Sequence, residues 1–243
     1  MIRGVVVMAL VVLVSASLAA QALQRAAHAQ GSLAADESIG DAIALGDFNA
    51  DRRIDFITSM SQPGNKGILN RAGNGTTWEV SNVESLRPGA IIRGVAAADV
   101  NGDRRADMFV SWQNREGETA RTGIDLIMSQ PGGWVRVALW GTTGRDGVRG
   151  LGIGDLDGDG KHDVVGFTDQ ARPVVLKGLG KGGFTLDRAE GIELKVDACS
   201  AYTVTLADLD RDGRDEIVVG FAGEQCDGQG SFRAWKAQAK QGQ

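Results

Sequence analysis

The chain has 243 residues, a formal net charge of −5, 35 glycines, 2 cysteines and 2 histidines. Its length allows one or two domains with a sizeable core, and its acidic balance argues against a nucleic-acid-binding protein, which usually carries a basic surface. His28 falls in the leader described next, so any Ser-His-Asp, Cys-His or zinc site would depend on His162 alone. Zinc sites need several Cys or His ligands, so the composition speaks against both kinds of chemistry.

Residues 1–29 have the pattern of a secretory signal peptide. Arg3 precedes an apolar run from Gly4 to Val14, and Ala27-His28-Ala29 forms an A-x-A cleavage site. The run is shorter than the ~20 residues that span a membrane, although an uncleaved anchor is the alternative. We therefore expect an exported domain at 30–243, periplasmic or secreted, with no membrane span. Cleavage removes two arginines and no acid, which changes the net charge from −5 to −7.

One acidic nine-residue pattern occurs four times. It has Asp at positions 1 and 5, Asp or Asn at position 3, and Asp or Glu at position 9. Each copy lies between two short apolar stretches, which predicts a β-hairpin with an acidic turn. The four copies, called loops 1 to 4 below, are residues 47–55, 99–107, 155–163 and 208–216.

The repeat extends beyond the hairpin. A third apolar stretch, a Gly-rich turn with an aromatic residue and a fourth apolar stretch follow, and four strands in about 54 residues are typical of a propeller blade. We predict an all-β, β-propeller-like array of four repeats with four-stranded antiparallel blades, near residues 40–91, 92–147, 148–200 and 201–243. The fourth repeat lacks its last turn and strand, and Ser32 to Ala35 could supply that strand.

These repeats resemble the FG-GAP/VCBS family, the calcium-loop propeller repeats of integrin α-subunits and many exported bacterial proteins. Loop 3 reads Asp-Leu-Asp-Gly-Asp-Gly-Lys-His-Asp and matches the D-x-D-x-D-G-x-x-D loop of the family fully. The resemblance covers about 40–243 and implies a calcium-binding propeller. Because the family serves many purposes, it implies no particular ligand. The usual ring of the family has seven blades, more than four repeats provide.

The spacing of the carboxylates predicts calcium sites. Positions 1, 3, 5 and 9 offer side-chain oxygens and position 7 offers a backbone carbonyl, and an all-oxygen set of this size suits Ca²⁺ better than Mg²⁺. The stronger expected ligands are Asp155, Asp157, Asp159, Lys161, Asp163, Asp208, Asp210, Asp212, Arg214 and Glu216, with Lys161 and Arg214 acting through the backbone. The weaker ones are Asp47, Asn49, Asp51, Arg53, Asp55, Asp99, Asn101, Asp103, Arg105 and Asp107, with Arg53 and Arg105 acting through the backbone.

We expect two bound Ca²⁺ ions, in loops 3 and 4, and at most four. Loops 3 and 4 have Gly160 and Gly213 at position 6, where the chain turns sharply, whereas loops 1 and 2 have Arg52 and Arg104 there. A left-handed residue with a Cβ costs about 1 kcal/mol. Loops 1 and 2 also have Asn at position 3, which removes one ligand charge.

Two alternatives to metal binding remain open. The loops could be turns that use Asp, Asn and Gly for their turn chemistry alone. In loops 1 and 2 the arginine pairs at positions 6 and 7 could neutralise the carboxylates internally. His162 occupies position 8 of loop 3 and is expected to face solvent without a catalytic role.

The two cysteines flank the hairpin that carries loop 4. Cys199 and Cys226 are nearly equidistant in sequence from Asp212, so a regular hairpin brings them opposite each other. In an exported protein this arrangement predicts a disulfide, with two free buried thiols as the alternative.

The aromatic residues divide into two groups. Trp78, Trp134 and Phe184 occupy matching places in three repeats, which favours a role in blade packing. Trp112 and Trp140 fall outside that repeat position, so they are the candidates for an exposed sugar-stacking or protein-binding surface.

Three functions are compatible with this pattern. The first is an exported, calcium-binding, non-catalytic propeller module that binds a protein or glycan partner. The second is a carbohydrate-active lyase or hydrolase that uses carboxylates outside the loops. However, 15 of the 31 acidic residues lie within the loops, and the others form no recognisable catalytic pair. The third is a structural envelope component whose ring is completed by a partner or by self-association.

Overall fold

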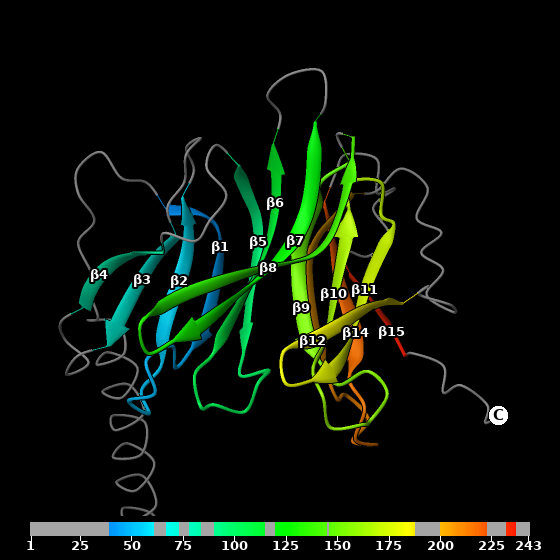
Figure 1. Ribbon diagram of the computed structural model, residues 1–243. Helices are drawn as coiled ribbons and strands as arrows, with labels where there is room; N and C mark the ends of the chain where they lie inside the picture. The colour runs from blue at the N-terminus through cyan, green and yellow to red at the C-terminus, as the bar shows by residue number, and fades with distance from the viewer. Residues whose placement is uncertain are drawn as a thin grey trace, which may run out of the picture.

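A computed structural model describes residues 39–60, 67–72, 78–83, 90–114, 120–144, 146–187, 200–222 and 232–236. All regular elements among them are β-strands (Figure 1), and no described helix has the length and apolarity to cross a membrane. The predicted leader at 1–29, Ser32 to Ala35, Cys199 and Cys226 lie outside the described residues. The predictions that rest on them therefore stay predictions.

The strands form four separate antiparallel sheets, which we call blades 1 to 4. Blade 1 contains β1 (Ile39–Gly46), β2 (Asp55–Met60), β3 (Gly67–Ala72) and β4 (Trp78–Val83). Blade 2 contains β5 (Ile91–Ala98), β6 (Asp107–Asn114), β7 (Arg121–Gln130) and β8 (Gly133–Thr143). Blade 3 contains β9 (Val148–Gly154), β10 (Asp163–Thr168), β11 (Pro173–Gly180) and β12 (Gly183–Asp187). Blade 4 contains β13 (Ser200–Ala207), β14 (Glu216–Ala222) and β15 (Phe232–Trp235).

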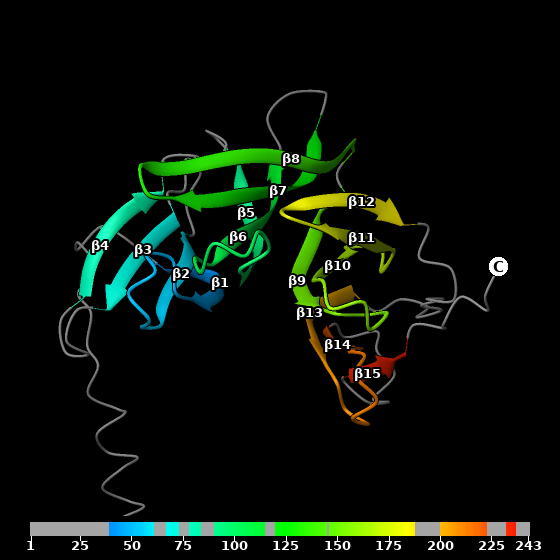
Figure 2. The same ribbon diagram turned by 60° about the horizontal axis from the view of Figure 1, so that its bottom comes forward.

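The blades follow one another in an arc (Figure 2). The first strand of each blade is innermost, so that β1 packs against β5, β5 against β9, and β9 against β13. No comparable packing joins β13 to β1 among the described strands. The all-β fold and the antiparallel four-blade array are confirmed, whereas the described residues form an open arc rather than a closed ring. As expected, the described part of blade 4 has only three strands.

Three hydrophobic clusters hold the arc together, one between each pair of successive blades. Successive side chains of a strand point to opposite faces of its sheet. On β6, Met108 therefore packs in the cluster shared with blade 1, while Phe109 packs in the cluster shared with blade 3. Both faces of an inner blade are covered, which explains why seven of the eight residues of β6 are buried.

The matching aromatic residues pack between strands and blades, as predicted. The ring centroids of Trp134 and Phe48 lie 6.0 Å apart, and Phe184 meets Phe109 edge-on at 5.2 Å. The side chain of Trp78 lies outside the described residues. The prediction that Trp112 is exposed is wrong, because only 7% of its surface is accessible and it belongs to the cluster between blades 1 and 2. Trp140 is half-buried.

Blades 2 and 3 approach most closely where β5 meets β9. A Cβ added to Gly94 would lie 3.0 Å from both the Cα and the N of Gly150, so only glycine fits there without displacing backbone. Ser111 closes the same contact, since its buried hydroxyl donates to the Val148 carbonyl at 3.0 Å.

Substitution of Gly94 tests this contact between the inner strands. We expect Gly94→Val to lower the free energy of unfolding by about 1–3 kcal/mol, because overpacking forces the two strands apart. Denaturant unfolding measures the change. Gly132→Val is the matched control, since nothing lies within 4 Å of a Cβ at that exposed turn. Equal effects of the two substitutions would contradict the close packing of β5 on β9.

Candidate metal centres

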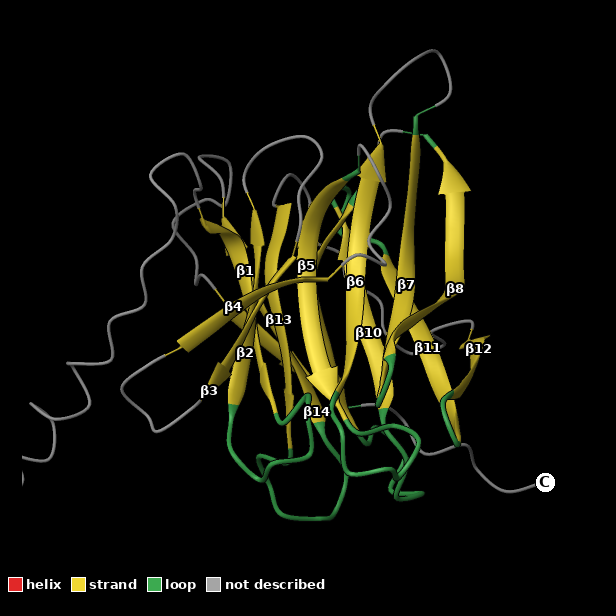
Figure 3. Ribbon diagram, turned by 60° about the vertical axis from the view of Figure 1, so that its left-hand side comes forward, coloured by secondary structure: helices red, strands yellow, loops and turns green. Residues whose placement is uncertain are grey.

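The four acidic loops lie at the same end of the blades, each joining the first strand of a blade to its second (Figures 1 and 3). Antiparallel pairing in each blade brings position 9 of the loop opposite the last residue of the first strand, as in the pair Gly154 and Asp163. Each loop is therefore closed at its base by the hairpin that carries it.

The carboxylate at position 1 organises each loop from within. In loop 3, Asp155 accepts hydrogen bonds from the backbone N–H groups of Asp159 at 3.1 Å and Gly160 at 2.7 Å. In loop 4, Asp208 accepts the equivalent bonds from Asp212 at 3.1 Å and Gly213 at 3.0 Å. Loops 1 and 2 also bond the N–H of position 6 to the carboxylate of position 1. All four loops thus share this inward-turned backbone.

Position 6 is left-handed in every loop, as the glycines of loops 3 and 4 suggested. The φ angle is 77° at Gly160 and 85° at Gly213, and it is 65° at Arg52 and 71° at Arg104. The two arginines therefore hold a conformation that costs a residue with a Cβ about 1 kcal/mol. Position 4 is left-handed too, which was not predicted, in the four residues Ala50, Gly102, Gly158 and Arg211.

The carboxylate at position 9 is buried and fastens the loop to the blade. Asp163 accepts hydrogen bonds from the N–H of Leu156 at 3.0 Å and from that of Gly178, on β11, at 2.8 Å. Asp107 accepts the equivalent bonds from Val100 and Ser129. Burial raises the pKa of Asp163, and it raises the pKa of Asp107 to about 6. A raised pKa means that the fold disfavours the ionised carboxylate, so a nearby cation would stabilise it.

Two clusters of three carboxylates could hold a metal ion, and both lie in the loops predicted to bind more strongly. Within each cluster, one oxygen from each residue lies within 4.8 Å of the others. The clusters consist of Asp155, Asp157 and Asp163 in loop 3, and of Asp208, Asp210 and Glu216 in loop 4. They bring together positions 1, 3 and 9 of the expected ligand set.

The carboxylate at position 5 is turned toward position 7 instead. Asp159 accepts both the backbone N–H and the ammonium of Lys161, at 2.9 and 2.8 Å. Asp212 accepts the backbone N–H and the guanidinium of Arg214, each at 3.1 Å. The ammonium of Lys161 lowers the pKa of Asp159.

Loops 1 and 2 form no such three-carboxylate cluster among the described residues. At position 3, Asn49 and Asn101 accept the backbone N–H of position 5 at 2.9 and 2.8 Å. Their amide groups also donate to the carboxylates of Asp51 and Asp103, at 3.2 and 3.3 Å. The asparagine amide therefore forms its hydrogen bonds within the turn, to position 5.

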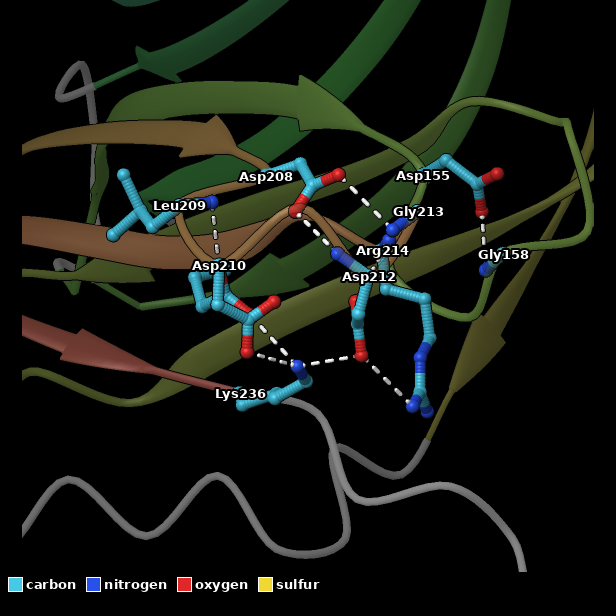
Figure 4. Close-up of polar contacts among 10 residues, drawn as sticks. Asp155, Gly158, Asp208, Leu209, Asp210, Asp212, Gly213, Arg214 and Lys236 are labelled. Carbon is cyan, nitrogen blue, oxygen red and sulfur yellow. Dashed lines mark hydrogen bonds and ion pairs between the residues drawn. The ribbon is translucent and has the colours of Figure 1, made fainter.

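Two lysines that the sequence analysis did not single out reach the acidic clusters. Lys177 on β11 pairs with Asp157. Lys236 follows β15, and its ammonium lies 2.6 Å from Asp210 and 2.6 Å from Asp212 (Figure 4). The hydrogen bonds to these two carboxylates raise the pKa of Lys236 above its ordinary value. Neither lysine could be found from loop spacing, because Lys177 lies on β11 and Lys236 follows β15, both outside the loop in sequence.

The arginine pairs of loops 1 and 2 are placed differently. None of the ion pairs found among the described residues joins them to a carboxylate of their own loop. Arg105 instead donates to the Phe48 carbonyl at 3.4 Å, across the interface between blades 1 and 2. Basic side chains instead pair with carboxylates of their own loop in loops 3 and 4, through Lys161 and Arg214. His162 is exposed, as expected.

One carboxylate oxygen of the loop 4 cluster has no hydrogen bond. Glu216 is only 7% exposed, and its Oε2 accepts the N–H of Leu209 at 2.8 Å. Its Oε1 is buried and accepts no hydrogen bond from the described residues, and the Lys236 ammonium lies 3.4 Å away. A buried oxygen of this kind is a ready ligand for a cation.

The two tryptophans that fall outside the repeat pattern meet at a shallow groove on blade 2. The groove has a volume of about 510 Å³. Trp112, Arg121, Thr122 and Trp140 line it, together with other residues of β8. Arg121 is exposed, whereas Trp112 contributes only a narrow edge.

Comparison with known proteins identifies the class of repeat. The sequence model of the FG-GAP-like repeat matches residues 31–110 and 155–219, which is more than half of the chain and includes all four loops. The chain therefore belongs to the FG-GAP-like repeat family, in agreement with the resemblance seen in its sequence. A search of curated proteins found no match.

Substitutions at positions 9 and 3 separate the structural role of the carboxylates from a metal-binding one. In the presence of EDTA, we expect Asp163→Ala to lower the free energy of unfolding by about 1–3 kcal/mol, because it leaves two backbone N–H groups without an acceptor. Asp157→Ala removes only a surface ion pair and should cost at most about 1 kcal/mol. Denaturant unfolding compares the two, and an equal loss would contradict the fastening role of position 9.

Proposed function

We propose that the protein is an exported, non-catalytic module of propeller-like blades that binds Ca²⁺ in loops 3 and 4 and presents its surface to a protein or glycan. The observation that carries the calcium proposal is the buried Glu216 Oε1, which lies in a three-carboxylate cluster, accepts no hydrogen bond from the described residues and has only a long ion pair of 3.4 Å with the exposed Lys236 ammonium. Hard oxygen ligands, turned toward one point by a left-handed backbone, suit Ca²⁺.

The chemistry of the donor set fits the ion in both loops. Each cluster offers three carboxylates at positions 1, 3 and 9, and the backbone carbonyl at position 7 is the further ligand that the loop pattern predicts. Lys236 and Lys177 partly neutralise these carboxylates through exposed ion pairs, and such pairs are weak in water. A divalent ion bound at a cluster would bring two positive charges to the carboxylates, where the exposed lysine brings one. Calcium binding would then turn both lysines out toward solvent.

Loops 1 and 2 are proposed to bind Ca²⁺ more weakly, if at all. Each has an asparagine in place of the position 3 aspartate, and its amide is already engaged with position 5. Left-handed residues with a Cβ add a conformational cost that loop 3 avoids altogether, whereas loop 1 has two of them and loops 2 and 4 have one each, Arg104 and Arg211. The difference between loops 2 and 4 therefore rests on position 3.

The placement of the histidine and of the buried carboxylates supports a binding role without catalysis. His162 is exposed and lies beside the loop 3 cluster. Most described carboxylates that are buried are loop residues at position 9. Export is supported by the signal-peptide pattern of residues 1–29. Within the part of the chain that the structure describes, no arrangement of paired carboxylates outside the loops supports the enzymatic alternative.

The groove on blade 2 is the proposed ligand surface. It combines the half-buried Trp140 with the exposed side chains of Arg121, Thr142 and Thr143. The hydroxyl of Thr122 is not available to a ligand, because it is buried and donates to the Trp112 carbonyl at 3.1 Å. An aromatic face flanked by hydrogen-bonding groups suits the apolar face and the hydroxyls of a sugar ring, and it equally suits a protein side chain.

Calcium should stabilise the protein through loops 3 and 4. We expect EDTA to lower the melting temperature and Ca²⁺ to restore it, because an ion that binds only the folded state at 100 times its Kd adds about 2.7 kcal/mol. Calorimetric titration of the metal-stripped protein should show two tight sites. The double variant Asp157→Asn/Asp210→Asn, which gives loops 3 and 4 the position 3 residue of loops 1 and 2, should lose most of the effect.

Asp146→Asn is the matched control for this experiment. It removes one carboxylate outside the loops while keeping the side-chain oxygen that accepts the Gln170 N–H, so the calcium response should persist. Four equal tight sites, or a melting temperature that ignores calcium, would overturn the assignment.

Ligand binding at the groove is tested with immobilised glycans and with protein partners recovered by pull-down. We expect Trp140→Ala to weaken binding by about twofold to tenfold, because one stacked ring is lost, and Arg121→Ala to weaken binding because a hydrogen-bond donor is lost. The control Leu186→Ala changes an exposed side chain on blade 3 and should bind normally. Turnover of a polysaccharide by the wild-type protein would favour the enzymatic alternative instead.

A further inference from the structure

The three interfaces between successive blades are built from equivalent residues. The residue four positions before each loop is buried against the preceding blade, as Val95, Leu151 and Val204 show, each with at most 8% of its surface exposed. The equivalent residue of blade 1 is Ile43, which has no preceding blade among the described residues and is 60% exposed.

A second position repeats this behaviour. The residue two positions before the loop packs against the preceding blade in Ala97, Ile153 and Leu206. In blade 1 the equivalent residue is Leu45, which is 63% exposed. Blade 1 therefore has an apolar outer face. Its exposed residues occupy the same positions that a preceding blade covers in blades 2, 3 and 4.

Blade 4 has the complementary outer face at the other end of the arc. Position 2 of the loop packs against the following blade in Phe48, Val100 and Leu156. The equivalent residue of loop 4 is Leu209, which is 59% exposed. Phe232 on β15 lies on the same face, opposite Gly220, and is 69% exposed.

The backbone gives the two end faces a specific register. At two of the three junctions, the N–H at position 8 of one loop donates to the carbonyl at position 1 of the loop before it; between blades 2 and 3 the Gly182 N–H donates to the Val100 carbonyl instead. Ala106 donates to Asp47 at 2.7 Å, and Asp215 donates to Asp155 at 2.7 Å. Asp215 also accepts the Asp155 N–H through its carboxylate at 2.7 Å, which locks loops 3 and 4 together.

The same backbone bond has no counterpart among the described residues at the two ends of the arc. The N–H at position 8 of loop 1 belongs to Ile54, whose side chain is 61% exposed, and the carbonyl at position 1 of loop 4 belongs to Asp208. Five of the eight large apolar side chains that are exposed in the described part of the chain are Ile43, Leu45, Ile54, Leu209 and Phe232. They lie at these two ends.

We propose that the outer face of blade 1 binds the outer face of blade 4 from a second copy of this chain. Within one chain the two faces do not meet, since β13 and β1 do not pack together and the ends of the arc lie apart (Figure 2). Two copies related by a two-fold axis form the contact twice, and a head-to-tail contact that closes in this way gives a ring rather than a filament. The ring has eight blades, within the range of four to eight that is typical of propellers.

Sedimentation velocity of the full protein tests the proposal, with and without calcium. The expected species is a dimer that dissociates on dilution. Ile43→Glu and Leu209→Glu should each weaken dimerisation by about tenfold to a hundredfold, because each places a carboxylate in an apolar interface. Leu186→Glu is the matched control, since Leu186 is 58% exposed on blade 3 outside both end faces and the variant should remain dimeric.

Mixing experiments identify which faces meet. A mixture of Ile43→Glu and Leu209→Glu proteins retains one intact interface, so it should dimerise more strongly than either variant alone. Ile54→Cys mixed with Leu209→Cys should form an oxidative cross-link between chains, whereas Ile54→Cys alone should not exceed the wild-type background from the native cysteines. Circular dichroism melting confirms that every variant is folded.

Each of the other outcomes overturns the proposal. A wild-type protein that stays monomeric at all concentrations shows that the faces are covered within the chain or left open. A dimer that survives both glutamate substitutions uses another surface. Cross-linking of Ile54→Cys to itself indicates a symmetric contact between two copies of blade 1, and growth into large polymers shows that the arc does not close.

Discussion

The buried carboxylate at position 9 is the interaction on which the rest of the structure depends. It is the last residue of an exposed acidic turn and also the first residue of a buried strand. In blade 3, Asp163 holds the turn through Leu156 and the third strand through Gly178. Hydrogen bonds to a charged acceptor are stronger than neutral ones, and this one acts inside the blade. The loop is therefore rigid at its base.

Rigid bases explain how a metal site and a blade interface can share one loop. Position 1 binds the inward-turned N–H groups through its side chain, and through its backbone it joins the next blade, as Asp155 does with Asp215. Position 2 packs into the cluster between the blades, as Leu156 does. A cation that orders the side chains of such a loop would also order the contact with the following blade. A cation bound at these clusters would thus also stabilise the contact between blades.

The four loops and their hairpins could be predicted from the sequence because the acidic pattern is local and occurs four times. The left-handed turn at position 6 was signalled by Gly160 and Gly213. The burial of Trp112 could not be predicted, because it depends on how β6 packs between two neighbouring blades. Lys177 and Lys236 were missed for a similar reason, since Lys177 lies on β11 and Lys236 follows β15, both outside the loop in sequence.

The repeated interfaces also determine how the free energy of unfolding is distributed among the blades. Arrays in which each unit contacts only its neighbours behave as nearly one-dimensional systems, with a free energy that is a sum over units and junctions. Blades 2 and 3 each have two junctions within the chain, whereas blades 1 and 4 have one each. In a single chain we therefore expect local opening to begin at the outer blades and move inward, and the dimer proposed above would remove this difference by giving blades 1 and 4 a second junction each. The centre of the arc, where Gly94 meets Gly150, is the last part of the array to lose its protection from solvent exchange.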